Sequence, residues 1–178
     1  MKRTLAVFFF CGFIFGSFFI SCSMLDITRE FTYVINLTVN ESGSEFYVEK
    51  LLSAADETSD IENYADKLVS IDIKKVEYTV TKFTGPDDQM INLAQLEIAD
   101  TTGHGLQLLG KASDEYLNNL TFVTKELELE PAGVRRFEEL YMYSPHAAKF
   151  FFSGNANTEP LDFQIKFYVI IEVTGNPI

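Results

Sequence analysis

The strongest constraint on the fold of this chain is an alternating pattern near its C-terminus. From Leu161 to Val173 every second residue is apolar, and most residues between them are polar. A period of two places successive side chains on opposite faces of a β-strand, so the segment predicts a long strand with one buried face. Tyr168 and Ile170 interrupt the polar face, which predicts that the middle of the strand is covered on both sides. Such a strand requires a sheet with a second layer packed against it.

The same alternation occurs in residues 31–39 and again in residues 69–83. In the second of these segments the apolar residues change phase at Lys74-Lys75. Because a slip of one residue turns every following side chain to the other face, a continuous strand here needs an extra residue. The sequence therefore predicts a β-bulge near the two lysines.

A turn and a return strand follow this segment. Gly85-Pro86-Asp87-Asp88 has the composition of a tight turn. Residues 91–98 are again apolar at alternating positions, with a phase change at Ala94-Gln95. We expect segments 69–83 and 91–98 to pair as a hairpin that contains bulges.

One amphipathic helix is predicted over residues 131–143. Pro131 suits the first helical position, where a missing N–H is not needed. Val134, Phe137 and Tyr141 fall on one face, and Ser144-Pro145 ends the segment. Seven or more short strands with one helix predict an all-β fold, an antiparallel two-sheet sandwich of immunoglobulin-like type.

The N-terminus carries the pattern of a cleaved leader. Lys2 and Arg3 precede an apolar run that is shorter than the roughly 20 residues a membrane-spanning helix needs. The run ends in Phe19-Ile20-Ser21-Cys22, which resembles the lipobox of a bacterial lipoprotein signal peptide. The resemblance implies cleavage before Cys22 and acylation of that cysteine, which would tether the protein to a membrane. An ordinary secretory signal cut near Ser21 and an uncleaved signal anchor are the alternatives.

This interpretation divides the chain into a signal peptide at residues 1–21, a tether at 22–30 and a sandwich domain at 31–178. Loss of Lys2 and Arg3 with the leader would change the net charge from −12 to −14. So acidic a surface argues against binding to nucleic acid. Because no cysteine follows Cys22, disulfides, thiolate catalysis and cysteine-ligated zinc are excluded from the mature domain. We expect no cofactor and no metal.

The chain also resembles the small envelope lipoproteins of the Bacteroidota that carry immunoglobulin-like sandwiches. The resemblance rests on the lipobox, on residues 60–64 leading into 71–78, and on the terminal alternating strand. It implies the sandwich fold and an envelope location, and it carries over no active site. Ser23 follows the cysteine where some inner-membrane lipoproteins have aspartate, which favours the outer membrane. The residues after Cys22 also lack the acidic cluster that resembles a Bacteroidota surface-export signal, since only Asp26 lies nearby. A periplasm-facing position is therefore favoured over the cell surface.

Few residues suggest catalytic or metal chemistry. His104 lies between two glycines and His146 follows a proline, and no Gly-x-Ser-x-Gly motif accompanies them. We therefore expect two loop histidines and no enzyme, although a triad assembled in space stays open as an alternative. Asp87-Asp88 with Asn92 could bind calcium through oxygen atoms, but the spacing of a calcium loop is missing, which favours a structural turn.

Two further segments suggest surface roles. Asp100-Thr101-Thr102 resembles the short acceptor site for O-glycosylation of exported Bacteroidota proteins, which implies a glycan on Thr101. The run Phe150-Phe151-Phe152 is either a partner patch or is buried between sheet and helix, and burial is favoured.

The sequence as a whole predicts a lipid-anchored, non-catalytic interaction or structural module. Its partners are the membrane, through acylated Cys22, and a protein, glycan or lipid bound by loops or by a sheet edge. A sandwich that holds an apolar ligand between aromatic-rich layers is the second expectation. A small hydrolase is the third.

Overall fold

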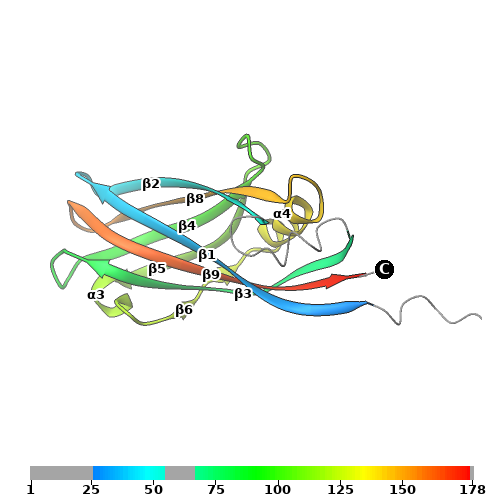
Figure 1. The fold of residues 1–178 in the computed structure, drawn as a ribbon. Helices are drawn as coiled ribbons and strands as arrows, with labels where there is room; N and C mark the ends of the chain where they lie inside the picture. The colour runs from blue at the N-terminus through cyan, green and yellow to red at the C-terminus, as the bar shows by residue number, and fades with distance from the viewer. Residues whose placement is uncertain (1–25, 55–66, 177–178) are drawn as a thin grey trace, which may run out of the picture.

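The computed structural model describes residues 26–54 and 67–176, which form two packed antiparallel sheets (Figure 1). The first sheet has the order β1-β9-β3-β6 and the second has the order β2-β8-β4-β5-β7. Two helices, α3 and α4, lie between strands of the second half of the chain. The elements of the first sheet are β1 (Ile27–Glu41), β9 (Leu161–Gly175), β3 (Leu68–Phe83) and β6 (Lys125–Glu126). The others are β2 (Glu45–Ser53), β8 (Ala147–Ala156), β4 (Met90–Ala99), β5 (Gln107–Tyr116), β7 (Glu128–Leu129), α3 (Leu117–Leu120) and α4 (Pro131–Met142).

The strands pair like the two arms of one long hairpin. The first strand pairs with the last, β2 with β8, β3 with β6 and β4 with β5. Rolling such a nested hairpin into two sheets produces the jelly-roll arrangement of a β-sandwich. The predicted antiparallel two-sheet sandwich is therefore confirmed. Its strand order differs from the predicted immunoglobulin-like order, in which the first two strands pair with each other. Alternation along a strand specifies its buried face but not its neighbours.

The terminal strand β9 lies between β1 and β3 and carries much of the core. Its odd-numbered side chains, from Leu161 to Val173, are buried against the second sheet. On the other face Ile170 is buried and Tyr168 is half-buried, as the interrupted polar pattern predicts. The partner strand β1 begins at Ile27, earlier than the predicted Phe31, because its first residues pair with the C-terminal end of β9.

The predicted bulge in β3 is confirmed, whereas the predicted hairpin with β4 is wrong. The register between β3 and β9 shifts between Ile73 and Lys75. However, β3 belongs to the first sheet and β4 to the second, so the turn at residues 84–89 crosses from one sheet to the other. The irregularity of β4 against β8 lies between Ile91 and Leu93, slightly before the predicted position.

Helix α4 closes the sandwich at one end. It begins at Pro131, as predicted, and ends at Met142. Phe137 and Tyr141 are fully buried and stack at 4.4 Å between ring centroids. Tyr33 of β1 and Phe150 of β8 contact this pair, so the helix joins the cores of both sheets.

The register places the two ends of the domain far apart. Ile27 and Leu68 both lie opposite Gly175, whereas Glu41 lies opposite Leu161 at the other end. The chain therefore enters at the end where β9 finishes, and we call this the tether end. The segments 42–44, 84–89, 117–124 and 157–160 gather at the opposite end, which we call the loop end (Figure 1). No helix in the described ranges is long and apolar enough to cross a membrane.

Candidate functional site

The loop end is held together by the side chain of Gln89, which is fully buried. Its Nε2 donates hydrogen bonds to the carbonyl oxygens of Thr158 and Pro160, both at 3.0 Å. Its own backbone carbonyl accepts from the N–H of Leu117 at 3.1 Å. Through its side chain and its backbone carbonyl, Gln89 therefore joins three separate loop segments. Buried hydrogen bonds of this kind favour one arrangement of the loops, because breaking one leaves a buried polar group without a partner and without water.

Asn157 forms a second connection between the same loops. Its Oδ1 accepts from the N–H of Met90 at 2.7 Å, and its Nδ2 donates to the carbonyl of Asp88 at 3.0 Å. Asn118 adds a contact from α3, since its Nδ2 donates to Asp87 Oδ1 at 3.3 Å. The loop end is thus an ordered surface built from residues far apart in the chain.

The charged side chains within the loop-end segments are acidic, and two lysines, Lys82 on β3 and Lys125 on β6, lie beside these segments. Asp87, Asp88 and Glu159 lie in the loops, and Glu41 and Glu45 flank the turn at 42–44. None of these carboxylates forms an ion pair within residues 26–54 and 67–176. The described ion pairs lie on the strands and on α4, with Asp100 and Glu130 contributed by adjoining segments. The loop end therefore presents a net negative charge to solvent.

The acids proposed as calcium ligands do not converge. Asp87 accepts from Asn118, and the backbone carbonyl of Asp88 accepts from Asn157. Asn92 donates to Asn155 on β8 at 3.1 Å. In the part of the chain that the structure covers, no three acidic, histidine or cysteine side chains are grouped so as to hold a metal ion. Asp87 and Asp88 lie in a turn, where aspartate is common, and Asn92 lies in β4.

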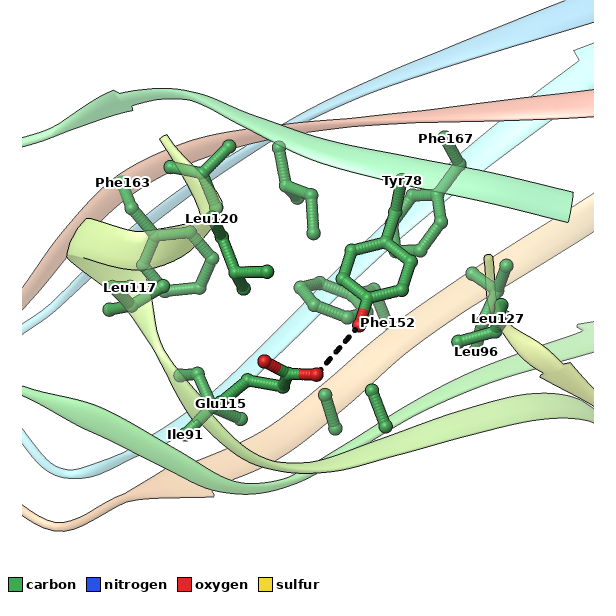
Figure 2. A pocket seen from close by; sticks show the side chains of 14 residues that line it. Tyr78, Ile91, Leu96, Glu115, Leu117, Leu120, Leu127, Phe152, Phe163 and Phe167 are labelled. Atoms are coloured by element: carbon green, nitrogen blue, oxygen red, sulfur yellow. Dashed lines mark hydrogen bonds between the residues drawn. The ribbon is translucent and has the colours of Figure 1, made fainter. Parts of the chain in front are cut away.

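A small apolar cavity lies between the sheets, and Figure 2 shows it from close by. Its wall is formed by both sheets, by α3 and by Leu127, and it includes Val80, Leu96, Leu120 and Phe152. Its free volume is about 20 Å³, which is room for about one water molecule. A cavity this small cannot hold a lipid without displacing its walls.

Two polar side chains, Tyr78 and Glu115, line this cavity. Glu115 accepts a hydrogen bond from the Tyr78 hydroxyl at 3.4 Å (Figure 2) and pairs with Lys125 Nζ at 2.5 Å. Burial, reinforced by the Glu115 carboxylate, raises the pKa of the Tyr78 hydroxyl. Tyr78 therefore stays protonated at neutral pH and serves as a donor to Glu115. Tyr78 and Lys125 thus supply hydrogen-bond donors to the Glu115 carboxylate, which faces the cavity.

The turn between β4 and β5 contains the predicted residues Thr101 and His104. Asp100 Oδ1 accepts from the Thr102 hydroxyl at 2.6 Å and from the backbone N–H groups of Thr102 and His104, both at 2.9 Å. His104 Nδ1 lies 2.7 Å from the Thr102 hydroxyl oxygen. Since the carboxylate can only accept, the hydroxyl proton points to Asp100 and His104 must donate from Nδ1. His104 therefore cannot act as a base toward Thr102, and the three side chains stabilise the turn.

His146 also has a structural role. Its Nδ1 lies 2.8 Å from the carbonyl oxygen of Tyr141, so this nitrogen donates to the last turn of α4. Its backbone N–H donates to the Tyr143 carbonyl at 2.8 Å, and its own carbonyl accepts from Ala54. His146 thus closes the connection between α4 and β8. The two histidines lie in different connections and do not form one site.

The remaining predicted residues divide into three groups. Thr101 is exposed on its turn, so its modification stays a prediction. The run Phe150–Phe152 is buried, as expected, with Phe151 covered on the outer face by Tyr47 at 6.0 Å and by the ammonium of Lys149 at 5.5 Å. Phe19, Ile20, Ser21 and Cys22 lie outside the described residues. Sequence reasoning missed Gln89 and Asn157, because neither belongs to a local motif.

The Asp100 turn predicts a local dependence on pH. The hydrogen bond from the Thr102 hydroxyl, joined by the backbone N–H of His104, lowers the pKa of Asp100 from its ordinary 3.8 to about 2. Because the pKa of Asp100 is lower in the folded turn than in the unfolded chain, the ionised carboxylate stabilises the turn at pH values above 3.8. This contribution is lost as the pH falls through about 2. We expect the Asp100 carboxyl carbon to titrate near pH 2 by NMR. A midpoint near 4 would contradict the hydrogen-bonded turn, and Asp100→Asn provides the spectrum without this titration.

No protein-family model and no curated protein matches this chain. Among solved structures, the chain is similar to that of desmodium yellow mottle tymovirus, with 11% identity and a TM-score of 0.33 over 98% of this chain and 96% of that one. It is similar to turnip yellow mosaic virus, with 9% identity and a TM-score of 0.39 over 99% and 92%. It is also similar to the decameric BFDV capsid protein, with 9% identity and a TM-score of 0.39 over 83% and 99%. Likeness this distant carries nothing over to the function of this chain.

Proposed function

We propose that this protein is a lipid-anchored, non-catalytic interaction module of the bacterial cell envelope, which presents its loop end to a partner. The observation that carries the proposal is the placement of the chain entry and the loop end at opposite ends of the sandwich. Strand β1 alone spans 15 residues between them, or about 50 Å at the rise of an antiparallel strand. An anchor at Cys22 would hold the tether end at the bilayer and direct the loop end away from it.

The order of the loop end supports a binding role. Gln89 and Asn157 connect its segments before any partner arrives. A surface fixed in advance loses little conformational entropy on binding, which favours affinity and specificity. The proposal places the anchor in the outer membrane with the domain in the periplasm.

The two alternative functions receive less support. A carrier of apolar ligands needs more space than the cavity at Glu115 provides. A hydrolase needs a nucleophile beside a base, whereas His104 donates to Thr102 and His146 donates to a backbone carbonyl. Both histidines stabilise connections between elements.

The lipid anchor is tested by replacing Cys22. We expect the unmodified protein to incorporate a labelled fatty acid and to sediment with membranes. Cys22→Ala should lose the label and the acyl-dependent attachment, because two or more acyl chains are needed for stable anchoring. If the unmodified protein incorporates no labelled fatty acid and sediments with membranes with its leader attached, the protein is held by a signal anchor and the lipoprotein assignment is wrong.

The interaction role is tested by photo-crosslinking in intact cells. A photoreactive residue at Asn119, which is exposed on the loop end, should form adducts with a partner. The same residue at Gln107, which is exposed at the start of β5 near the tether end, is the matched control. Equal adducts from both positions, or none from Asn119, would contradict a loop-end interaction.

A further inference from the structure

Phe122 is an exception on this ordered surface. Its side chain is 80% exposed, the largest value for any large apolar residue in the described ranges. Val123 beside it is also exposed. An aromatic ring in water contributes little to folding, but single exposed apolar residues are common on protein surfaces, so exposure alone assigns no role to Phe122.

The backbone at Phe122 is unfavourable. Its φ is 58°, in the left-handed region that side chains of L-residues rarely adopt. Glycine adopts this conformation freely, and asparagine adopts it more readily than phenylalanine. If this position served only to turn the chain from α3 towards β6, either residue would suit it better. A bulky aromatic thus occupies a position where its backbone conformation opposes stability, a pattern that is common at functional positions.

The local structure holds Phe122 in a fixed position. Its N–H donates to the carbonyl of Val80 on β3 at 2.9 Å. The preceding Thr121 donates from its hydroxyl to Leu117 at 3.1 Å and from its N–H to Asn118 at 3.2 Å. Phe122 therefore projects from an anchored segment and has a defined direction before any partner binds.

The surroundings of Phe122 specify the chemistry of a partner. Through the contact between Asn118 and Asp87, the segment joins the acidic part of the loop end. The carboxylates of Asp87, Asp88 and Glu159 form no ion pairs among the described residues. Lys82 is exposed nearby and Lys125 is already paired with Glu115, so the net charge of this surface is negative and favours a positively charged partner. The same charge disfavours an anionic lipid surface.

We propose that Phe122 is the anchor residue of a protein interface. Its ring enters an apolar pocket of the partner, and lysine or arginine side chains around that pocket face the acidic loops. A central aromatic surrounded by charged residues is the common organisation of a binding hot spot. This inference rests on the proposed interaction role and names the kind of partner that the loop end recognises.

The first test measures stability and needs no partner. Phe122→Asn and Phe122→Gly should leave the melting temperature of the purified protein unchanged or raise it, because both relieve the backbone and remove an exposed ring. Tyr143→Asn is the matched control for loss of an exposed aromatic, since Tyr143 is 71% exposed and has an ordinary φ of −118°. A fall of several degrees for both Phe122 variants would show that the ring packs in the free protein and would overturn the proposal.

The second test uses the full-length protein in intact cells. A benzophenone amino acid at position 122 should crosslink to a basic protein, whereas the same residue at position 143 should not. The adduct should fall at least several-fold in Asp87→Asn/Asp88→Asn and at raised salt in permeabilised cells. An adduct with lipid or with an acidic protein, an adduct indifferent to the two aspartates, or no adduct would each overturn the proposal.

The interaction role of the loop end and the anchor role of Phe122 can be contradicted independently. Adducts from Asn119 but not from position 122 would leave the interaction module intact and remove the role of Phe122. An adduct from position 122 that persists in released Cys22→Ala protein would support the interface at Phe122. In the same experiment it would show that the membrane anchor is not needed for the interaction.

Discussion

Phe137→Ala is expected to lower the free energy of unfolding by about 3–5 kcal/mol. The ring is fully buried at the point where α4 meets both sheets, and it contacts Tyr33, Tyr141 and Phe150. Removing it leaves a cavity that the sheets cannot close, because their positions are fixed by the strand ladders. Denaturant unfolding followed by circular dichroism measures the change.

Phe122→Ala is the matched control, because it removes the same ring from an exposed position. We expect its free energy of unfolding to stay within about 0.5 kcal/mol of the unmodified protein. If Phe137→Ala costs no more than Phe122→Ala, then α4 does not belong to the core and the described closure of the sandwich is wrong.

Gly133→Ala should also destabilise the protein, by about 2–3 kcal/mol. In an exposed helix this change stabilises by about 0.5–1 kcal/mol, since alanine is the better helix former. Here an added Cβ would lie 2.2 Å from the carbonyl oxygen of Leu108 and 2.4 Å from Cα of Leu109. The helix would have to move away from β5, which loosens the packing of its buried face.

The matched control is Gly43→Ala, because a Cβ at Gly43 meets no atom within 4 Å. We expect this variant to have an unchanged or slightly higher melting temperature. Thermal unfolding of the two variants side by side separates the close approach of α4 and β5 from the general effect of removing glycine. Equal melting temperatures would contradict that close approach.

Local periodicity explains what could be predicted from the sequence. The alternation of β9, the bulge near Lys74 and the start of α4 at Pro131 each depend on residues within one element. The strand order could not be predicted in the same way. Whether the turn at residues 84–89 closes a hairpin or crosses to the other sheet depends on what its neighbours cover, and alternation is identical in both arrangements.

The loop end shows the same limit for the candidate site. Gln89 binds backbone carbonyls of Thr158 and Pro160, so the partners lie in a distant segment and leave no local pattern. In the sequence Phe122 is one apolar residue among many. Only its exposure and its positive φ in the folded protein distinguish it. The cavity at Glu115 is lined by residues of five strands and α3, so it could be recognised only once all of these elements were placed.

The pairing of β1 with β9 brings residues as far apart as Thr28 and Thr174 into contact. Contacts between such distant parts of a chain slow folding, because a large loop must close before they form. Strand β9 lies between β1 and β3 in the first sheet and follows both of them in the chain, so neither strand has this neighbour until β9 has been synthesised. The first sheet therefore cannot assemble before β9 is present, whereas β4 and β5 are neighbours in the chain and can pair earlier.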